Sequence, residues 1–327
     1  MFRWWKSPVP QLVARTCKSL LHAFTTGADD PGGLTINPYA GCAHRCVYCY
    51  ATYDWTPEFY DTIVAKTNAP KVLARELAQW TQPAIPPVFL ASATDAYQPA
   101  EGVFRLTRQC VEILQRCGVP YYIFTKSSSV VRDFDLHARY RNKCLIVWSL
   151  TTVDEGLKRF LEPYAAGVRG VLRAMSEAAA RRIVTGVNVD PIIPGVTDDS
   201  ADLKALVHAC VAHGVRYFSG GLLRLREDIW PRIRGLLRAL GRENTIQYIE
   251  RLYFATPQRS GPYFEAPPDY QRKVLHELQA TVQSGGAHWG LPIESETETP
   301  AQCGGMALAP KRLWLQESML AYVPTAP

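Results

Sequence analysis

Three cysteines lie close together in residues 37–50, which read NPYAGCAHRCVYCY. Cys42, Cys46 and Cys49 follow one another at the spacing C-x3-C-x2-C. Cysteine thiolates are the usual protein ligands of a [4Fe–4S] cluster, and three thiols on one loop can bind three of its four irons. The next cysteine along the chain is Cys110, so we expect the fourth iron to stay open for a small molecule. An iron with an open position predicts a catalytic site.

Two other interpretations of this loop stay open. With His44, the three cysteines could form a Cys3His zinc site in a nucleic-acid-binding module, although zinc motifs usually come as two spaced pairs. A noncatalytic iron–sulfur protein for electron transfer or sensing is the second alternative. Colour separates the metals, because a protein with an iron–sulfur cluster is brown when purified without oxygen and a zinc protein is colourless.

The cysteine loop resembles that of the radical S-adenosylmethionine (SAM) enzymes, with Tyr48 before the third cysteine. The longer string NPYAGCAHRCVYCYA is similar to the loop of the spore photoproduct lyase family, which is also described as DNA-repair-photolyase-like. This resemblance implies that the open iron binds the amino and carboxylate groups of SAM. An electron from the cluster then cleaves SAM to methionine and a 5′-deoxyadenosyl radical, which abstracts hydrogen from a substrate.

The resemblance also implies partners. The electron would come from an external donor of the flavodoxin or ferredoxin type. By family resemblance the substrate would be a nucleic acid lesion or base, whereas a peptide or a small metabolite is the alternative. The sequence sets neither the substrate nor the oligomeric state.

Strands and helices alternate along most of the chain. Apolar strand patterns cover residues 34–37, 87–92, 120–125, 144–150, 183–189 and 217–223, with helical patterns near 70–80, 103–117, 127–140, 169–182 and 200–213. This alternation predicts parallel βαβ units in an α/β fold. Periodicity does not choose between an open doubly wound sheet and an incomplete barrel. The family resemblance implies a partial (β/α)6 TIM-type barrel with the cysteine loop after its first strand.

Three regions are expected. Residues 1–30 form an N-terminal lead-in with a helix around 11–23, and residues 31–225 form the radical SAM partial-barrel core. Residues 226–327 form a mainly helical C-terminal extension that covers the barrel, with helices near 227–240 and 269–282.

Polar residues follow the predicted strands, at the edge where parallel barrels gather their chemistry. Residues 94–101, TDAYQPAE, are similar to a TDxYQPxE segment of the family. Its Asp95, Tyr97, Gln98 and Glu101 would contact SAM, the cysteine loop or the substrate, with Thr94 and Asp95 predicted as cofactor contacts. Alternatively, the segment would only fix the loop by hydrogen bonds. Lys126 and Ser149, at the next two strand ends, match residues that contact SAM, and Lys126 would face the carboxylate.

The fifth strand supplies the remaining predicted cofactor contacts. Asn188 lies on this strand, and the segment after it resembles the part of radical SAM enzymes that packs beside adenine. There Ile192 would give an apolar face and Gly195 a close approach of the backbone. In the loop after the fourth strand, Glu162 and Arg169 also match the family.

One position departs from the family. Spore photoproduct lyases carry a cysteine near the end of the second strand that returns a hydrogen atom to the product radical, and this chain has Ser92 there. A serine O–H bond is too strong to donate that hydrogen. Tyr48 and Tyr50 match tyrosines implicated in the same relay, and at most one of them is expected to face SAM. We therefore expect SAM cleavage without efficient repair of the spore lesion.

Composition limits the remaining choices. The 327 residues carry a net charge of +6, which permits an anionic partner but does not demand one. Arginines gather in residues 224–242 as a candidate phosphate track. No membrane span or secretory signal is expected. The cysteines outside the loop predict free thiols in a reducing compartment, hence a cytoplasmic protein: Cys17, Cys110, Cys117, Cys144, Cys210 and Cys303.

Overall fold

The computed structural model describes residues 9–24, 33–53, 57–81 and 85–291. Parts of the expected N-terminal lead-in and C-terminal extension lie outside the described residues, and so does Cys303.

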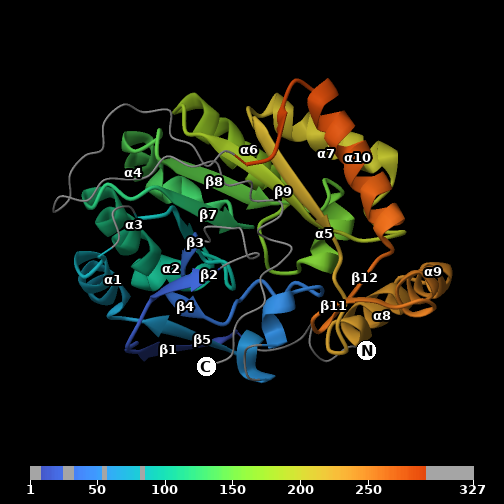
Figure 1. Ribbon diagram of the computed structural model, residues 1–327, viewed down its shortest axis with the longest axis horizontal. Coiled ribbons are helices and arrows are strands. Elements are labelled where there is room, and N and C mark those ends of the chain that lie inside the picture. Colours follow the sequence, from blue (N-terminus) through green and yellow to red (C-terminus); the bar gives the residue numbers. More distant parts are fainter. Residues whose placement is uncertain (1–8, 25–32, 54–56, 82–84, 292–327) are drawn as a thin grey trace.

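An eight-stranded sheet forms the centre of the fold (Figure 1). Its strand order is β13-β10-β9-β8-β7-β6-β3-β2, and every neighbouring pair is parallel except β2 with β3. The strands are β2 (Leu21–Phe24), β3 (Gly33–Ile36), β6 (Val88–Leu90), β7 (Tyr121–Thr125), β8 (Cys144–Ser149), β9 (Thr185–Ile192), β10 (Tyr217–Leu222) and β13 (His288–Trp289). All six predicted strands are confirmed, in the predicted parallel arrangement, and the sheet is open and not a closed barrel.

Helices connect the parallel strands and cover the outer face of the sheet (Figure 1). They are α1 (Ala69–Ala78), α2 (Pro99–Phe104), α3 (Leu106–Arg116), α4 (Phe134–Arg139), α5 (Glu155–Leu161), α6 (Val168–Ala180) and α7 (Ser200–Ala212). The helix predicted near 103–117 is two helices, because Arg105 between them takes a left-handed conformation with φ of 53°. The helix predicted over 127–140 is a 3-10 turn, Ser129–Asp133, followed by α4.

The helix predicted around residues 11–23 is wrong. Residues Gln11–Arg15 form strand β1, which pairs in parallel with β5 (Thr62–Lys66), and Leu21–Phe24 form β2. Both segments find a strand edge to pair with, and such distant partners override local helical preference.

A second, small sheet carries the cysteine loop. Its order is β1-β5-β4, where β4 (Tyr39–Ala40) is antiparallel to β5 and directly precedes the loop. The next residue, Gly41, has φ of 80°, and a Cβ atom there would lie 2.5 Å from the carbonyl oxygen of Thr62. Only glycine fits this turn without displacing β5. The amide of Cys42 then donates to the carbonyl of Phe59 at 3.2 Å.

The two faces of the main sheet differ. The outer face packs against the helices and forms the main core, with Trp148 fully buried. On the inner face, alternate residues of β6, β7 and β8 form a smaller apolar cluster that includes Phe89 and Phe124. The inner face and the carboxyl ends of the strands therefore enclose the space where the cysteine loop lies.

The C-terminal part of the described chain is mainly helical. It comprises α8 (Trp230–Ala239), α9 (Glu243–Phe254), a hairpin of β11 (Gln258–Ser260) and β12 (Tyr263–Glu265), and α10 (Pro268–Ser284). Figure 1 shows α8, α9 and the hairpin together at one end, near the segment after the cysteine loop, and α10 alongside α7. No helix among the described residues is long and apolar enough to cross a membrane.

Candidate active site

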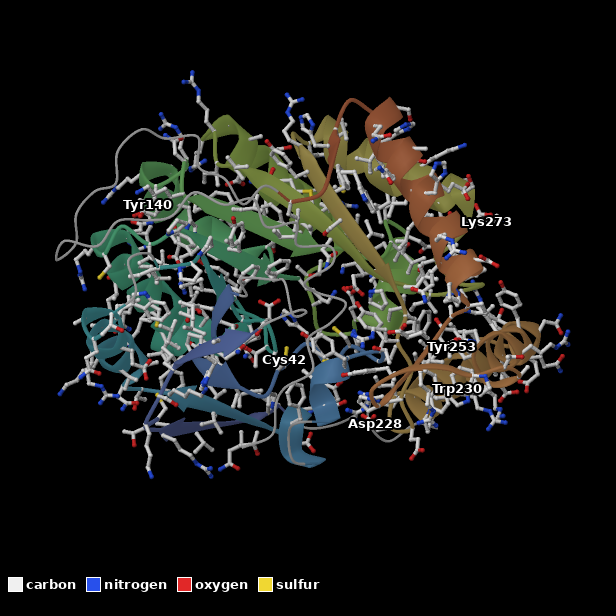
Figure 2. The ribbon with its side chains drawn as sticks, in the orientation of Figure 1. Cys42, Tyr140, Asp228, Trp230, Tyr253 and Lys273 are labelled. Carbon is white, nitrogen blue, oxygen red and sulfur yellow. The ribbon has the colours of Figure 1, made fainter. Side chains whose placement is uncertain are left out.

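A cavity opens at the carboxyl ends of the parallel strands. The cysteine loop, the ends of β6 to β10 and Tyr263 of β12 line it. Figure 2 shows Cys42 near the middle of the molecule. The predicted site residues that line the cavity are Cys42, Cys46, Tyr48, Cys49, Tyr50, Ser92, Thr94, Asp95, Lys126, Ser149 and Asn188.

Two predicted cofactor-binding residues do not line the cavity. Ile192 is fully buried, and Gly195 is exposed at the turn after β9. A Cβ atom on Gly195 would lie 3.1 Å from Thr245 and 3.3 Å from Tyr248, so this glycine allows the close approach of α9. Their contact with adenine stays a prediction.

The cysteine loop is held by backbone hydrogen bonds. The amide of Val47 donates to the carbonyl of Leu161 at 3.0 Å. The amide of Cys49 donates to the carbonyl of Cys46 at 3.2 Å. Burial raises the pKa of all three thiols. Three thiolates in this place therefore need positive charge beside them, which the irons of a cluster supply. The donor set fits an iron–sulfur cluster.

The zinc alternative has less support. His44 is buried, and its Nδ1 lies 3.4 Å from Oδ2 of Asp95, so the imidazole faces a carboxylate. Among the residues that the structure describes, no three Cys, His, Asp or Glu side chains are grouped closely enough to hold one metal ion. A cluster places less stringent demands on the thiols, because each thiolate binds a different iron.

Asp95 connects two strand ends with the cysteine loop. Its Oδ1 accepts hydrogen bonds from the amide of Tyr97 and the hydroxyl of Thr125, both at 2.8 Å, and its Oδ2 accepts from the amide of Lys126 at 2.6 Å. Burial would raise the pKa of Asp95, but His44 and these hydrogen bonds outweigh burial and lower it. The carboxylate is therefore ionised and holds the site together.

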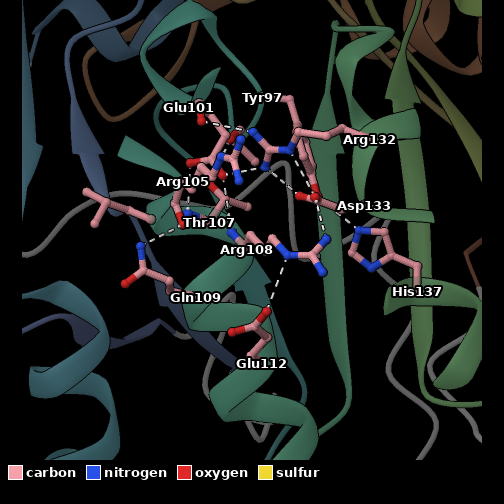
Figure 3. A network of polar contacts seen from close by, with 12 residues as sticks. Tyr97, Glu101, Arg105, Thr107, Arg108, Gln109, Glu112, Arg132, Asp133 and His137 are labelled. Atoms are coloured by element: carbon pink, nitrogen blue, oxygen red, sulfur yellow. Dashed lines mark hydrogen bonds and ion pairs between the residues drawn. The ribbon is translucent and has the colours of Figure 1, made fainter. Parts of the chain in front are cut away.

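Other residues of the 94–101 segment also bind the protein itself. The Gln98 side chain accepts from the amide of Ala43 and donates to the carbonyl of Gly41, both at 3.1 Å. Glu101 accepts from Tyr39 at 2.5 Å and from Arg132 at 2.7 Å, within the polar network of Figure 3. These contacts support the interpretation that the segment fixes the cysteine loop.

Lys126 and Ser149 lie side by side in the cavity wall. The Lys126 ammonium donates to the carbonyl of Ser149 at 3.3 Å and to Oε1 of Glu162 at 3.2 Å. Glu162 is buried and also binds Lys158 and the hydroxyl of Tyr48. Burial favours neutral Glu162, yet Lys126 and Lys158 hold its pKa well below the usual range. Lys126 is therefore a charged group with an ionised partner.

The two predicted relay tyrosines have different surroundings. Tyr48 is buried, and its hydroxyl donates to Glu162. The Lys126 ammonium lies over the Tyr48 ring, with Nζ 5.3 Å from the ring centroid. Tyr50 is 38% exposed, and its hydroxyl donates to the carbonyl of Ser92. The Ser92 hydroxyl is itself 2.7 Å from that of Thr35. Both tyrosines border the cavity, and Tyr50 lies directly beside the substituted position.

A further wall of the cavity comes from the ends of β9 and β10 and from β12. The sequence interpretation included Arg224 only in the candidate phosphate track and Asp190 only in the segment after the fifth strand, and it assigned neither to the site. This C-terminal wall contains Asp190, Leu222, Arg224 and Tyr263. The Arg224 guanidinium lies 4.1 Å from the centre of the Tyr263 ring, and its Nε lies 3.3 Å from Glu265. That contact lacks hydrogen-bond geometry, so Nε and Nη2 of Arg224 are buried without a hydrogen-bond partner among the residues that the structure describes.

Asp190 and Arg224 each directly follow a predicted strand, and this position is the sequence signal that could have assigned them to the site. Burial raises the pKa of Asp190, although Lys126 and Arg224 act in the opposite direction. Tyr263 had no such signal, since it comes from a hairpin after the alternating part of the chain.

An open parallel sheet with three cysteines on the loop after its first parallel strand defines a class of protein. The family model of the radical SAM superfamily matches residues 36–207, more than half of the chain. The chain therefore belongs to the radical SAM superfamily. Members of this superfamily are enzymes that generally bind a [4Fe–4S] cluster and SAM and need an external electron donor.

The chain is also similar to individual proteins. An uncharacterised protein of Mycobacterium tuberculosis is 31% identical over 295 residues, which cover 86% of this chain and 83% of that protein. A "Radical SAM Nalpha-GlyT isomerase" of Pseudomonas phage M6 is 24% identical over 187 residues, 55% of this chain and 37% of that protein.

Solved structures show the same fold. A spore photoproduct lyase variant with bound AdoMet and dinucleoside spore photoproduct has a TM-score of 0.64 at 17% identity. The match covers 85% of this chain and 81% of that one. Another variant of that lyase has a TM-score of 0.63 at 18% identity, with the same coverage. The spore photoproduct lyase-like fold expected from the cysteine loop is confirmed.

Proposed function

We propose that this protein cleaves SAM reductively at a [4Fe–4S] cluster held by Cys42, Cys46 and Cys49, and uses the resulting radical to abstract hydrogen from a substrate. The observation that carries this proposal is that the three thiols, Lys126 and Ser149 line one cavity. When bound, the cluster supplies the electron that cleaves SAM.

The remaining residues of the cavity prepare the site. Lys126 offers its charge to the SAM carboxylate from a position fixed by Glu162, which keeps the ammonium protonated. Phe89, Ala91 and Phe124 give the cavity an apolar side that keeps water away from a radical. Asp95 keeps the ends of β6 and β7 in register with the cysteine loop.

For the substrate we propose a nucleic acid base or lesion. Support comes from the family resemblance and from the fold, shared with a lyase solved with a dinucleoside lesion. Arg224 supports it as well, because its donors without partners suit an anionic group of a substrate.

A peptide or small-metabolite substrate is the second candidate, and one observation favours it. The other arginines of the candidate phosphate track mostly have acidic partners: Arg226 and Arg232 with Asp228, Arg234 with Glu250, and Arg238 with Glu243. Paired arginines attract phosphates less strongly. Binding of single- or double-stranded DNA that does not weaken with salt would favour this second candidate.

Removal of a cluster ligand tests the reaction. We expect anaerobically reconstituted wild-type protein to bind about four irons and to form 5′-deoxyadenosine when reduced with dithionite. Cys46→Ala should lose SAM cleavage. Cys210→Ala, which removes a buried thiol of α7 that does not line the cavity, should keep it. Full activity of Cys46→Ala would contradict the proposal.

The hydrogen-return step has its own test. We expect the wild-type protein to cleave SAM but not to restore thymines efficiently from spore photoproduct, because Ser92 cannot donate the hydrogen atom. Ser92→Cys should raise repair measurably if the lesion fits the cavity, and Ser92→Ala is the matched control. Efficient repair by the wild-type protein would show that the substitution does not block this step.

A further inference from the structure

Arg232 reaches the cysteine loop from a distant part of the chain. It belongs to α8 in the C-terminal segment, yet its Nη2 donates to the carbonyl of Cys49 at 3.1 Å and to the hydroxyl of Thr52 at 3.0 Å. Its Nη1 donates to the hydroxyl of Tyr60 at 2.8 Å. One guanidinium therefore binds three groups on the segment that contains and follows the cluster ligands.

Tyr60 extends this contact to a second cysteine. Its hydroxyl donates to the carbonyl of Cys46 at 2.9 Å. The backbone carbonyls of two of the three cluster ligands are thus held by Arg232, one directly and one through Tyr60. A loop fixed in this way keeps its thiols in a defined arrangement.

The Arg232 side chain is itself held in place. Its Nε donates to the carbonyl of Asp228 at 3.1 Å, and the Asp228 carboxylate accepts from Thr52 at 3.0 Å. The side chain is 18% exposed, so solvent screens its charge only in part, and the Asp228 carboxylate, 3.5 Å from Nη2, offsets part of it. Figure 2 shows Asp228 and Cys42 on neighbouring parts of the molecule.

A cluster gains negative charge when it is reduced. The reduction potential of an iron–sulfur cluster depends on net charge, on hydrogen bonds and on solvent exposure. A fixed positive charge beside the ligand loop therefore stabilises the reduced cluster more than the oxidised one. Arg232 provides such a charge at the carbonyl of Cys49.

We propose that Arg232 is a positioning residue that fixes the cysteine loop and makes the cluster easier to reduce. This inference rests on the proposed function only in that a cluster must bind the three thiols. It makes α8, which lies beyond the residues matched by the family model, a part of the redox centre.

The test is a redox titration of the reconstituted full-length protein, followed by electron paramagnetic resonance, without SAM or substrate. Arg232→Gln should lower the equilibrium constant for one-electron reduction about tenfold, which corresponds to about 59 mV for a one-electron couple. Arg232→Lys keeps the charge but loses the planar fork of donors, so its shift should be smaller. Tyr60→Phe keeps the charge in place and should change the potential least.

Arg234→Gln is the matched control on the same helix. The Arg234 guanidinium is 46% exposed and pairs with Glu250, so its loss should leave the potential unchanged. An unchanged potential in Arg232→Gln at wild-type iron content would overturn the inference.

Iron content separates the remaining outcomes. If Arg232→Gln keeps its far-ultraviolet circular dichroism but binds no cluster, the loop-fixing role is supported, and Arg232→Lys then gives the potential. If Arg232→Gln does not fold, Asp228→Asn takes its place: it removes the carboxylate that offsets the Arg232 charge and should raise the potential, and an unchanged potential in that variant would overturn the inference. Wild-type protein that takes up no iron would overturn the proposed function instead.

Discussion

The two walls of the cavity satisfy their polar groups in different ways. On the cysteine side, Lys126 and Asp95 are surrounded by protein partners at hydrogen-bond distance. On the C-terminal side, Arg224 has two buried donors without hydrogen-bond partners in the described part of the chain, and burial raises the pKa of Asp190. The first wall is preorganised for a fixed reaction, whereas the second has binding capacity left for a ligand. The difference indicates where substrate specificity would be encoded.

The largest expected effect comes from Glu162→Gln on the cysteine side. The neutral amide leaves Lys126 and Lys158 buried without a counter-ion, and removal of one partner of a buried ion pair costs about 3–5 kcal/mol. We expect a loss of that order in the free energy of unfolding, measured with urea at pH 7. Glu250→Gln, which breaks the exposed pair with Arg234, should cost less than about 1 kcal/mol. Similar losses of unfolding free energy in Glu162→Gln and Glu250→Gln would contradict the expected difference between the buried and the exposed ion pair.

The stability of the protein is expected to depend on pH through a buried histidine, His137. His137 is fully buried, with Tyr97 at 2.9 Å from Nε2 and Tyr121 at 3.0 Å from Nδ1 (Figure 3 shows its surroundings). Burial lowers the pKa of His137 to about 4, and the nearby Asp133 offsets this only in part.

The unfolded state binds this proton near pH 6.5 and the folded state only near pH 4, so stability falls as the pH falls between these values. We expect His137 to account for a loss of about 2–3 kcal/mol between pH 7 and pH 4.5. The measurement compares the free energies of unfolding of the wild type, His137→Gln and the exposed control His208→Gln. The same pH dependence in His137→Gln and the wild type would contradict the expectation.

A smaller effect is expected for SAM binding. Lys126→Ala removes a charge-assisted contact worth about 1.5–3 kcal/mol, so the affinity for SAM should fall roughly ten- to a hundredfold. The cluster should survive, which iron analysis checks. Lys71→Ala, on the exposed face of α1, is the control. Unchanged SAM affinity in Lys126→Ala would mean that Lys126 forms the ion pair with Glu162 but does not contact SAM.

The smallest expected effect lies in the C-terminal wall. Arg224→Gln should leave SAM binding and iron content unchanged but weaken the binding of the dinucleotide TpT about fivefold, or about 1 kcal/mol. Arg173→Gln, which removes an exposed arginine of α6 outside the candidate phosphate track, is the control. Equal binding of TpT by wild type and Arg224→Gln would assign Arg224 a structural role.

Local patterns predicted the cysteine loop and the strand ends, because a cysteine spacing or an apolar strand is contained in a few neighbouring residues. The same patterns failed around residues 11–23, where pairing with β3 and β5 decides the structure. They also gave no sign of the contact between Arg232 and Cys49, which depends on how α8 packs. Glu162 was found only as a weak family match, although its spacing from Lys158 fits one helical turn.

The turn at Gly41 has a consequence for how the protein matures. Pairing of β4 with β5, the fit of Gly41 against Thr62 and the bond from Cys42 to Phe59 involve no thiol. The start of the cysteine loop is therefore shaped by the polypeptide before any iron arrives. Binding of the proposed cluster would then not require this turn to form anew, because the polypeptide already fixes the backbone at Cys42.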